Sequence, residues 1–249
     1  MSTPIVSLRN VVAGYGAGDI LKGVDLDVQA GSVTRLIGPN GAGKSTVLKC
    51  ISGLLRPRTG SVVYDGEAID RLNPRQRLLR GVVHVPQDRS LFPAMTVWDN
   101  LLMGGYAMPD QKEVRRRVEA AADVFPICRK RARDHAGSLS GGEQKQVELA
   151  RTLVLEPRLI LLDEPSIGLD PKSRTQVFAS IRNLAQRGIT VLLVEQNARS
   201  GLAASDTGAV LETGVVRLVD SGSNLLNSPE VARLYLGGHV TAPVAPGPQ

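Results

Sequence analysis

The run from Gly38 to Ser45 limits the fold of this chain more than any other part of the sequence. Its residues, GPNGAGKS, match the pattern G-x-x-x-x-G-K-[S/T] at every position. An apolar stretch, residues 33–37, precedes it, and a helix is expected to begin near Lys44. Glycines let the backbone curl so that several N–H groups point at one phosphate, and the helix adds the positive end of its dipole. The sequence therefore predicts a strand, a phosphate-binding loop and a helix in succession.

Each residue type in this loop has an expected role. Lys44 is expected to reach the β- and γ-phosphates of ATP, and the Ser45 hydroxyl to ligate Mg²⁺. The other nucleotide contacts predicted here are Gly38, Pro39, Asn40, Gly41, Ala42, Gly43 and Thr46. A glycine-rich turn with an unrelated lysine is the alternative, but the complete pattern and its flanks disfavour it. The motif alone does not separate the many NTPases and kinases that share it.

A second apolar strand ends in two acids. Leu159–Leu162 is followed directly by Asp163 and Glu164. A buried parallel strand delivers the residues at its carboxyl end to the ligand crevice. We therefore expect Asp163 to hold Mg²⁺ through water and Glu164 to polarise an attacking water. A charged strand end at the surface is the alternative, which the complete phosphate loop makes less favourable.

Composition and hydrophobic pattern predict one α/β domain. Of the 249 residues, 42% are hydrophobic but only 3% are aromatic, so the core must consist of Leu, Val, Ile and Ala. Residues 5–36 and a hairpin around 60–66 resemble short strands with tight turns. Residues from about 96 to 156 are expected to form an inserted helical subdomain, after which strand and helix alternate as in a parallel sheet. The tail, 239–249, is expected to be disordered because it is rich in Pro and Ala.

Local patterns predict where some helices begin. Thr96 resembles the first residue of a capping box, and Asp170 can cap a helix that has Pro171 in its first turn. Phe92 and Trp98 are interpreted as core residues, with a contact to a partner as the alternative.

Charge leaves several kinds of partner open, whereas the cysteines, the N-terminus and the apolar runs argue against some classes of protein. The net charge of +6 is compatible with nucleic acid, an anionic membrane surface or phosphate ligands, or with none of these. Cys50 and Cys128 form neither a zinc nor a disulfide pattern and suit a reducing cytoplasm. The N-terminus does not resemble a signal peptide, and the apolar runs are far shorter than the ~20 residues of a membrane span. Any role at a membrane is thus expected to require a partner.

At Leu139–Glu143, with the sequence LSGGE, the chain resembles the ABC ATPase family, whose signature is LSGGQ. Tyr15 matches the aromatic residue that stacks on adenine in that family. Gln87 matches its glutamine loop, which contacts the nucleotide and Mg²⁺, and residues 166–170 match its D-loop. The resemblance covers residues 5–238. It implies a P-loop NTPase fold with a mostly parallel core sheet, an antiparallel β subdomain and an inserted helical subdomain.

The signature also implies partners. Ser140, Gly141 and Gly142 precede a helical run, so free N–H groups would offer a second anion site. In the family this site contacts the γ-phosphate of ATP held by the opposite subunit, in a head-to-tail dimer with an identical or paralogous ATPase. The resemblance further implies two membrane-spanning permease subunits, an extracytoplasmic solute-binding protein reached indirectly, and no nucleic acid. The expected location is peripheral, at the cytoplasmic face of the inner membrane.

One departure narrows the resemblance. The family usually has a histidine where this chain has Gln196, and glutamine can bond the γ-phosphate but cannot shuttle a proton. We assign Gln196 to the catalytic set with Lys44 and Glu164. The stretch VEQN at 194–197 and the ending YLGG at 235–238 resemble the F-type ATPase of branched-chain amino-acid importers.

Three alternatives remain open at this point. Related urea, amide or other amino-acid importers use similar subunits. A soluble ABC ATPase acting on DNA, ribosomes or cluster assembly is disfavoured because no tandem cassette, long coiled coil or cysteine-rich site is present. A regulatory subunit that does not hydrolyse ATP is disfavoured by the intact Lys44, Ser45 and Glu164.

Overall fold

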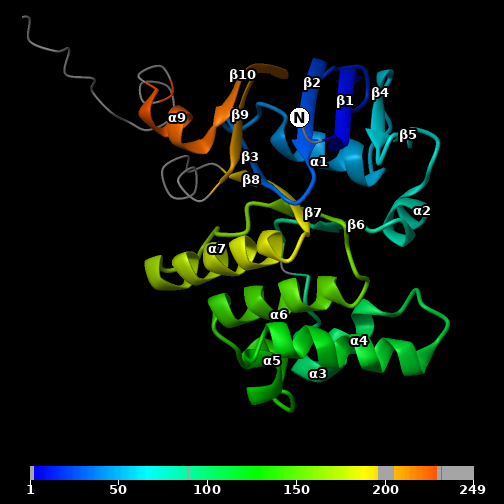
Figure 1. Ribbon diagram of the computed structural model, residues 1–249, viewed down its shortest axis with the longest axis vertical. Helices are drawn as coiled ribbons and strands as arrows, with labels where there is room; N and C mark the ends of the chain where they lie inside the picture. Colours follow the sequence, from blue (N-terminus) through cyan, green and yellow to red (C-terminus); the bar gives the residue numbers. More distant parts are fainter. Residues whose placement is uncertain (1–2, 89, 196–204, 229–230, 232–249) are drawn as a thin grey trace, which may run out of the picture.

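The computed structural model describes residues 3–88, 90–195, 205–228 and 231. Two sheets occupy one end of the molecule and a group of helices the other, with the phosphate loop between the sheet strands and α1 (Figure 1). The predicted α/β fold class is confirmed, with a mixed sheet, a second antiparallel sheet and a helical layer.

The smaller sheet is antiparallel, as the alternating N-terminal pattern indicates. Its order is β2-β1-β4-β5, with β1 at Pro4–Ala13, β2 at Leu21–Gln29, β4 at Thr59–Tyr64 and β5 at Glu67–Ala68. On β2, Val24, Leu26 and Val28 are buried while the residues between them are exposed. This period of two places one face of the sheet on the core.

The larger sheet carries the site. Its order is β10-β9-β3-β8-β7-β6, with β3 at Val33–Ile37, β6 at Val82–Val85, β7 at Leu159–Asp163, β8 at Thr190–Glu195, β9 at Thr207–Glu212 and β10 at Val215–Ser221. All neighbours pair in parallel except β9 with β10. Every residue of β3, β7 and β8 is buried, because helices cover both faces.

Two helices flank the larger sheet. Along β7, Leu159 and Leu161 pack in the cluster that contains α1 (Lys44–Ser52), whereas Ile160 and Leu162 pack in the cluster that contains α7 (Pro171–Gln186). Alternate side chains of a strand point to opposite faces, so the two helices lie on opposite sides of the sheet. Two short helices, α2 (Pro74–Leu79) and α9 (Gly222–Asn227), complete this part.

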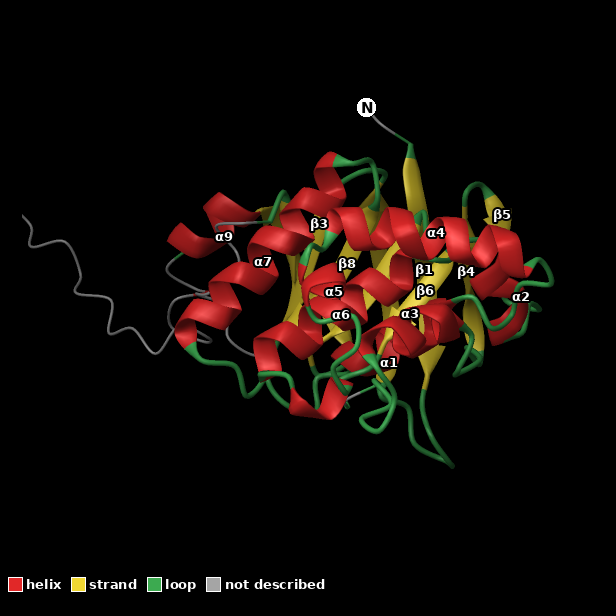
Figure 2. Ribbon diagram, turned by 90° about the horizontal axis from the view of Figure 1, so that it is seen from below, coloured by secondary structure: helices red, strands yellow, loops and turns green. Residues whose placement is uncertain are grey.

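The helical layer surrounds one helix. Its members are α3 (Val97–Gly104), α4 (Gln111–Val124), α5 (Ile127–Lys130), a 3₁₀ turn at Ala136–Ser138 and α6 (Gly141–Leu153). Helix α6 contacts α3, α4, α5 and α7. Seen from below, these helices lie in front of the strands (Figure 2). The predicted starts are confirmed, since Thr96 Oγ1 accepts from the Asp99 N–H at 3.0 Å and Asp170 caps α7.

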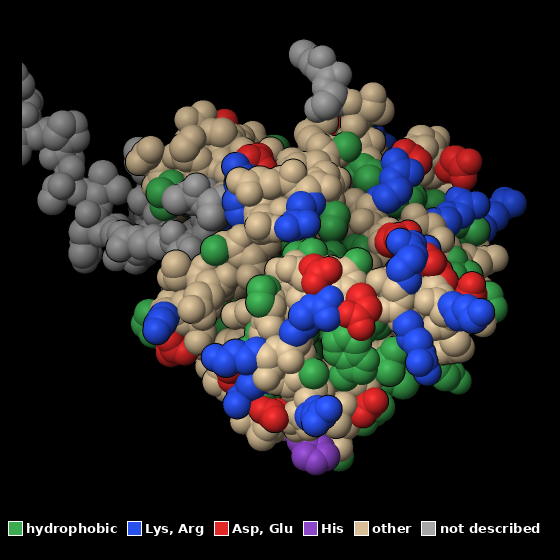
Figure 3. Space-filling model, turned by 60° about the horizontal axis from the view of Figure 1, so that its bottom comes forward, with side chains coloured by type: hydrophobic (Ala, Val, Ile, Leu, Met, Phe, Trp, Pro, Cys, Tyr) green, Lys and Arg blue, Asp and Glu red, His purple; other side chains and the backbone are tan. Residues whose placement is uncertain are grey.

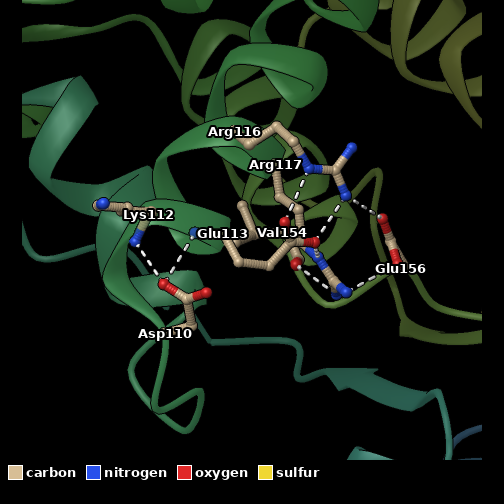
Figure 4. Close-up of polar contacts among 7 residues, drawn as sticks. All are labelled: Asp110, Lys112, Glu113, Arg116, Arg117, Val154 and Glu156. Atoms are coloured by element: carbon tan, nitrogen blue, oxygen red, sulfur yellow. Dashed lines mark hydrogen bonds and ion pairs between the residues drawn. The ribbon is translucent and has the colours of Figure 1, made fainter.

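The first turns of α4 are tied to the chain beyond α6 by ion pairs (Figure 4). The Glu113 carboxylate accepts from Arg116 Nε and Arg117 Nε, both at 2.7 Å. Arg117 Nη2 also lies 2.9 Å from Glu156 Oε2. The two guanidinium groups lower the pKa of Glu113 to about 2. Two arginines of the basic run at 115–117, Arg116 and Arg117, are thus paired with carboxylates.

The segment before α3 corrects one prediction. Phe92 is 45% exposed instead of being core, whereas Trp98 is partly buried against the helical cluster. The reason is Asn100, which is fully buried and bonds both the N–H (2.8 Å) and the carbonyl (3.0 Å) of Phe92. These two bonds fix the backbone of Phe92 in the loop before α3, and its ring remains partly in solvent.

Residues 93–98 run beside residues 132–137. Four backbone bonds join the two segments, from Gly137 N to Pro93 O (3.0 Å), Ala136 N to Met95 O (2.9 Å), Val97 N to Asp134 O (2.9 Å) and Trp98 N to Ala132 O (3.1 Å). We call these four bonds the ladder. It fixes the loop around Phe92 to the stretch that leads into Ser140.

Within the described ranges, no helix combines the length and the apolar character needed to cross a membrane. Cys50 and Cys128 are both buried free thiols, and burial raises the pKa of each to about 12. Both thiols are therefore protonated and unreactive at neutral pH.

Candidate functional site

The loop after β3 has a backbone that requires glycine. Gly41 has φ of 81° and Gly43 has φ of 105°, in the left-handed region that side chains disfavour. A Cβ on Gly43 would lie 2.7 Å from the Leu21 side chain, and one on Gly38 would lie 2.2 Å from the Leu211 carbonyl oxygen. The glycines are thus needed both for the turn and for close packing, and α1 begins at Lys44 as predicted.

Lys44 lies inside this loop. Its Nζ donates to the carbonyl oxygens of Gly38 at 2.9 Å and Pro39 at 3.1 Å. Burial lowers the pKa of Lys44, while the nearby Glu164 and Asp163 carboxylates oppose that shift. A buried ammonium held by carbonyl oxygens alone is suited to receive an anion, such as a phosphate.

Two oxygen ligands suited to Mg²⁺ meet at the base of the loop. Ser45 Oγ donates to Asp163 Oδ1 at 3.0 Å, and Asp163 is only 6% exposed. Burial raises the pKa of Asp163, and the Ser45 bond and the Lys49 and Lys44 charges partly offset this. In the described part of the chain no three His, Cys, Asp or Glu residues gather as a metal cage. A hydroxyl plus one carboxylate fits Mg²⁺, which keeps waters and binds substrate phosphates.

Glu164 follows Asp163 with an unusual backbone. Its φ is 45°, and its N–H donates to the Val194 carbonyl at 3.0 Å. Non-glycine residues in this region cost about 1–2 kcal/mol and occur often at functional sites. Gln87, beyond the end of β6, donates through Nε2 to Glu164 Oε2 at 3.5 Å. The ends of β6 and β7 therefore bring together two residues that the sequence separates widely.

These residues line one cleft of about 390 Å³. The predicted residues on its wall are Asn40, Gly41, Gly43, Lys44, Ser45, Thr46, Gln87 and Glu164. Ile20 and Ile167 also line it, and sequence reasoning missed both as wall residues. Gly38, Pro39 and Ala42 belong to the loop but not to this wall, and Asp163 lies beneath it against Ser45. Gln196 lies outside the described residues.

Tyr15 is near this region but does not line the cleft. Its ring is 49% exposed, and Lys49 Nζ, on α1, lies 5.5 Å from the ring centroid. An open aromatic face beside the helix that follows the phosphate loop suits the stacking of a planar base.

The signature residues lie elsewhere. Ser140 is the N-cap of α6, and Gly141 and Gly142 are its first residues rather than residues before it, which corrects the predicted boundary. Ser140 Oγ accepts from the Glu143 N–H at 3.3 Å, and Glu143 Oε2 accepts from the Ser140 N–H at 2.9 Å. The Ser140 N–H lowers the pKa of Glu143. None of the three signature residues lines the 390 Å³ cleft, so one chain does not bring both predicted anion sites together.

The loop after Gln87 is fastened to α6. Glu148, which is buried, accepts from the Ser90 N–H at 2.8 Å, and Arg151 Nη1 donates to the Ser90 carbonyl at 2.9 Å. Sequence reasoning missed this contact. The signal was present, since Glu148 and Arg151 are charged residues three apart in an otherwise apolar part of a helix.

The helical end exposes large apolar side chains. Phe92 is 45% and Tyr106 81% exposed. A pocket of about 290 Å³ opens beside Phe92, between Leu91, Pro93 and Gly137. Figure 3 shows hydrophobic side chains gathered on the lower face of the molecule, with Lys, Arg, Asp and Glu around them. Exposed apolar groups with a charged rim are typical of a contact surface for another protein.

Sequence comparison relates the chain to transport ATPases. The family model described as ABC transporter matches residues 21–167. BraG of Pseudomonas aeruginosa, a high-affinity branched-chain amino acid transport ATP-binding protein, is 38% identical over 94% of this chain and 100% of its own length. LivF of Archaeoglobus fulgidus, a probable branched-chain amino acid transport ATP-binding protein, is 38% identical over 90% of this chain and 95% of its own length. LptB of Haemophilus influenzae, a lipopolysaccharide export system ATP-binding protein, is 34% identical over 94% of this chain and 97% of its own length.

Solved structures agree with these relatives. The ADP conformation of MJ1267, an ATP-binding cassette of an ABC transporter, superposes with a TM-score of 0.87 at 29% identity, over 95% of this chain and 100% of that one. A dimeric post-hydrolysis state of the cassette MJ0796, bound to ADP and phosphate, gives a TM-score of 0.75 at 27% identity. The superposition covers 87% of this chain and 98% of that one.

Proposed function

Because the chain belongs to the ABC transporter family of ATP-binding cassettes and is thus an ATPase, we propose that it powers an importer of branched-chain amino acids. The observation that carries the proposal is the cleft in which Lys44, Ser45 and Glu164 meet Gln87 above Asp163. The transported solute is inferred from BraG and LivF, each 38% identical to this chain. We assign the whole cassette to residues 5–238, with the helical subdomain at about 96–156.

The phosphates of ATP occupy the loop, where Lys44 binds the β- and γ-phosphates. Gly38 to Thr46 supply the loop backbone and the first turn of α1, with its N–H groups directed at the phosphates. Ser45, Asp163 and Gln87 would hold Mg²⁺, which when bound supplies positive charge at the β- and γ-phosphate oxygens. Tyr15 stacks on the adenine ring.

Glu164 acts on the attacking water. Its carboxylate orients the water and takes its proton as the bond from the water oxygen to the γ-phosphorus forms. The bond from the γ-phosphorus to the bridging oxygen of the β-phosphate breaks in the same step, and ADP is the leaving group. Gln87 positions the Glu164 carboxylate. Gln196 donates a hydrogen bond to the γ-phosphate but carries no proton. Lys44 stabilises the charge on the transferred group, so catalysis depends chiefly on positioning and electrostatics.

A second copy or a paralogue completes the site. Ser140, the N-cap of α6, does not line the chain's own cleft. The N–H groups of Gly141 and Gly142 lie in the first turn, where helices leave donors without intrahelical partners. In a head-to-tail dimer they bind the γ-phosphate of ATP held by the other subunit. The dimeric structure of the MJ0796 cassette, bound to ADP and phosphate, supports the dimer itself.

The remaining partners are two membrane-spanning permeases at the cytoplasmic face of the inner membrane and, through them, an extracytoplasmic solute-binding protein. The exposed Phe92 and Tyr106 belong to the surface that we assign to the permeases. We expect no nucleic-acid partner. A lipopolysaccharide exporter is the second candidate system, because LptB is 34% identical over 94% of this chain.

The proposal is tested by purifying the tagged chain from the membranes of cells that express it naturally, in mild detergent. We expect two permeases, a second ATPase and a binding protein that leucine, isoleucine or valine stabilises against heat. In the same purification, a Phe92→Asp variant should not retain the permeases, while its ATP binding should be unchanged. Recovery of lipopolysaccharide-export components instead would reject the importer, and absence of Mg²⁺-dependent phosphate release would reject the ATPase assignment.

A further inference from the structure

The loop that carries Tyr15 depends on glycine. It joins β1 to β2, and the Gly18 N–H closes it by donating to the Tyr15 carbonyl at 3.2 Å. A Cβ on Gly14 would lie 1.9 Å from the Gly18 carbonyl oxygen, and Gly16 has φ of 56°. Glycine permits these conformations but also permits many others, so the loop needs an additional constraint to hold one of them.

Arg58 supplies that constraint from a distant part of the chain. It precedes β4, and its N–H donates to the Val12 carbonyl at 2.8 Å, which fixes its backbone beside β1. Its guanidinium donates to the Gly16 carbonyl oxygen at 2.5 Å and, in two longer contacts of 3.5 Å, to those of Ala17 and Gly18. Nη1 also lies 2.9 Å from Asp19 Oδ1. Four consecutive residues of the loop thus share one cation.

A guanidinium suits this task because it is planar and carries five donors in a fixed arrangement, whereas a lysine ammonium presents three donors at one point. The side chain of Arg58 is 37% exposed, so each contact alone stabilises the fold little. Together the contacts restrict the loop before a ligand arrives, which reduces the entropy lost on binding.

The restricted loop has one outward aromatic group. Tyr15 is the residue whose carbonyl closes the turn, and its ring lies over Lys49 on the helix that begins with Lys44. The position of the ring relative to the phosphate loop is therefore set from two sides, by the loop that Arg58 holds and by α1.

We propose that Arg58 is a positioning residue that fixes the Tyr15 ring where it stacks on the base of a purine nucleoside triphosphate. The inference rests on the proposed nucleotide site and adds to it a residue that touches neither the phosphates nor Mg²⁺. Arg58 acts through Tyr15, so its effect is confined to ligands that have a base.

Titration calorimetry of the full chain with Mg-ATP and with Mg-tripolyphosphate tests this directly, because tripolyphosphate has no base. Arg58→Ala should weaken ATP binding about three- to tenfold and leave tripolyphosphate binding unchanged. Arg58→Lys should restore only part of the loss. Arg9→Ala is the matched control, since Arg9 pairs with Asp27 at 2.7 Å in the same sheet with similar exposure. It should change neither affinity.

A double-mutant cycle with Tyr15→Ala tests whether Arg58 acts through the ring. Tyr15→Ala combined with Arg58→Ala should bind ATP no more weakly than Tyr15→Ala alone. Additive losses, equal losses for both ligands, or an unchanged ATP affinity in Arg58→Ala would each overturn the inference. A wild-type chain that binds no Mg-ATP would instead overturn the proposed function.

Discussion

Ser45 Oγ donates a 3.0 Å hydrogen bond to Asp163 Oδ1 across 118 positions of sequence. The contact arises because β3 leads into α1 and β7 ends at the same edge of the larger sheet. The fold therefore preorganises the two oxygens that we assign to Mg²⁺. When Mg²⁺ binds, it would take the place of the hydrogen bond between Ser45 and Asp163.

Asp163→Asn should abolish most Mg²⁺-dependent hydrolysis while leaving the fold intact. Asparagine keeps an oxygen for the Ser45 hydroxyl but loses the charge that holds the cation, so we expect turnover to fall about 100-fold or more. ATP binding in the presence of EDTA should be unchanged. Asp123→Asn, on the exposed face of α4, is the control. A variant at Asp163 with normal turnover and normal Mg²⁺ dependence would remove this residue from the metal site.

Glu164→Gln should bind Mg-ATP with an unchanged Kd but turn over about 10²–10⁴ times more slowly, because the amide cannot accept the proton of water. Glutamine has the same branching as glutamate, so the φ of 45° is no harder to adopt. Phosphate release measures the rate and calorimetry the affinity, with Glu67→Gln on the exposed edge as the control. Wild-type turnover would exclude Glu164 as the base.

Asn100→Leu should lower the free energy of unfolding by about 2–4 kcal/mol. The leucine fills similar space but leaves the Phe92 N–H without its 2.8 Å acceptor. The carbonyls of Phe92 and Thr96 lose the Asn100 amide donor and keep only the backbone N–H groups of Met95 and residue 100. Urea unfolding gives the value. The same change at Asn183, exposed on α7, should cost less than about 0.5 kcal/mol. A loss at Asn100 as small as that would contradict the role given to its amide.

His84 should make the protein less stable in acid. Burial, with a smaller contribution from Lys49, lowers the pKa of His84 from 6.5 to about 4. Since the unfolded chain then binds the proton more tightly, the stability that neutral His84 supports is complete above pH 6.5 and lost as the pH falls to about 4. The loss is about 1.4 kcal/mol per pH unit, or ~3 kcal/mol in all.

Urea unfolding of the wild type and of His84→Gln between pH 7 and 4 measures how much stability the protonation of His84 removes. The wild type should lose more stability on acidification than the variant, because other titrating groups are common to both. Parallel curves for the two proteins would show that the imidazole, whose Nδ1 lies 3.2 Å from Ser52 Oγ, does not resist protonation.

The sequence allowed the phosphate loop, the two acids at the carboxyl end of the strand that became β7 and the caps at Thr96 and Asp170 to be predicted, because each depends on neighbouring residues. The fold class followed from the order of strand and helix patterns. Phe92 was predicted wrongly, because Asn100 holds its backbone through contacts that hydrophobicity does not encode. The Arg58 contacts were also missed, since they join residues that lie 39 positions or more apart in the sequence.

The ladder between residues 93–98 and 132–137 has a thermodynamic consequence. Only two residues separate Gly137 from Ser140, so the ladder connects the loop around Phe92 to the start of α6 through a short stretch of backbone. If a permease binds at Phe92 and a phosphate at Ser140, as we propose, we expect the two binding events to be linked by one coupling free energy. Reciprocity requires that if a bound permease raises the affinity of the chain for nucleotide by some factor, bound nucleotide raises its affinity for the permease by that same factor.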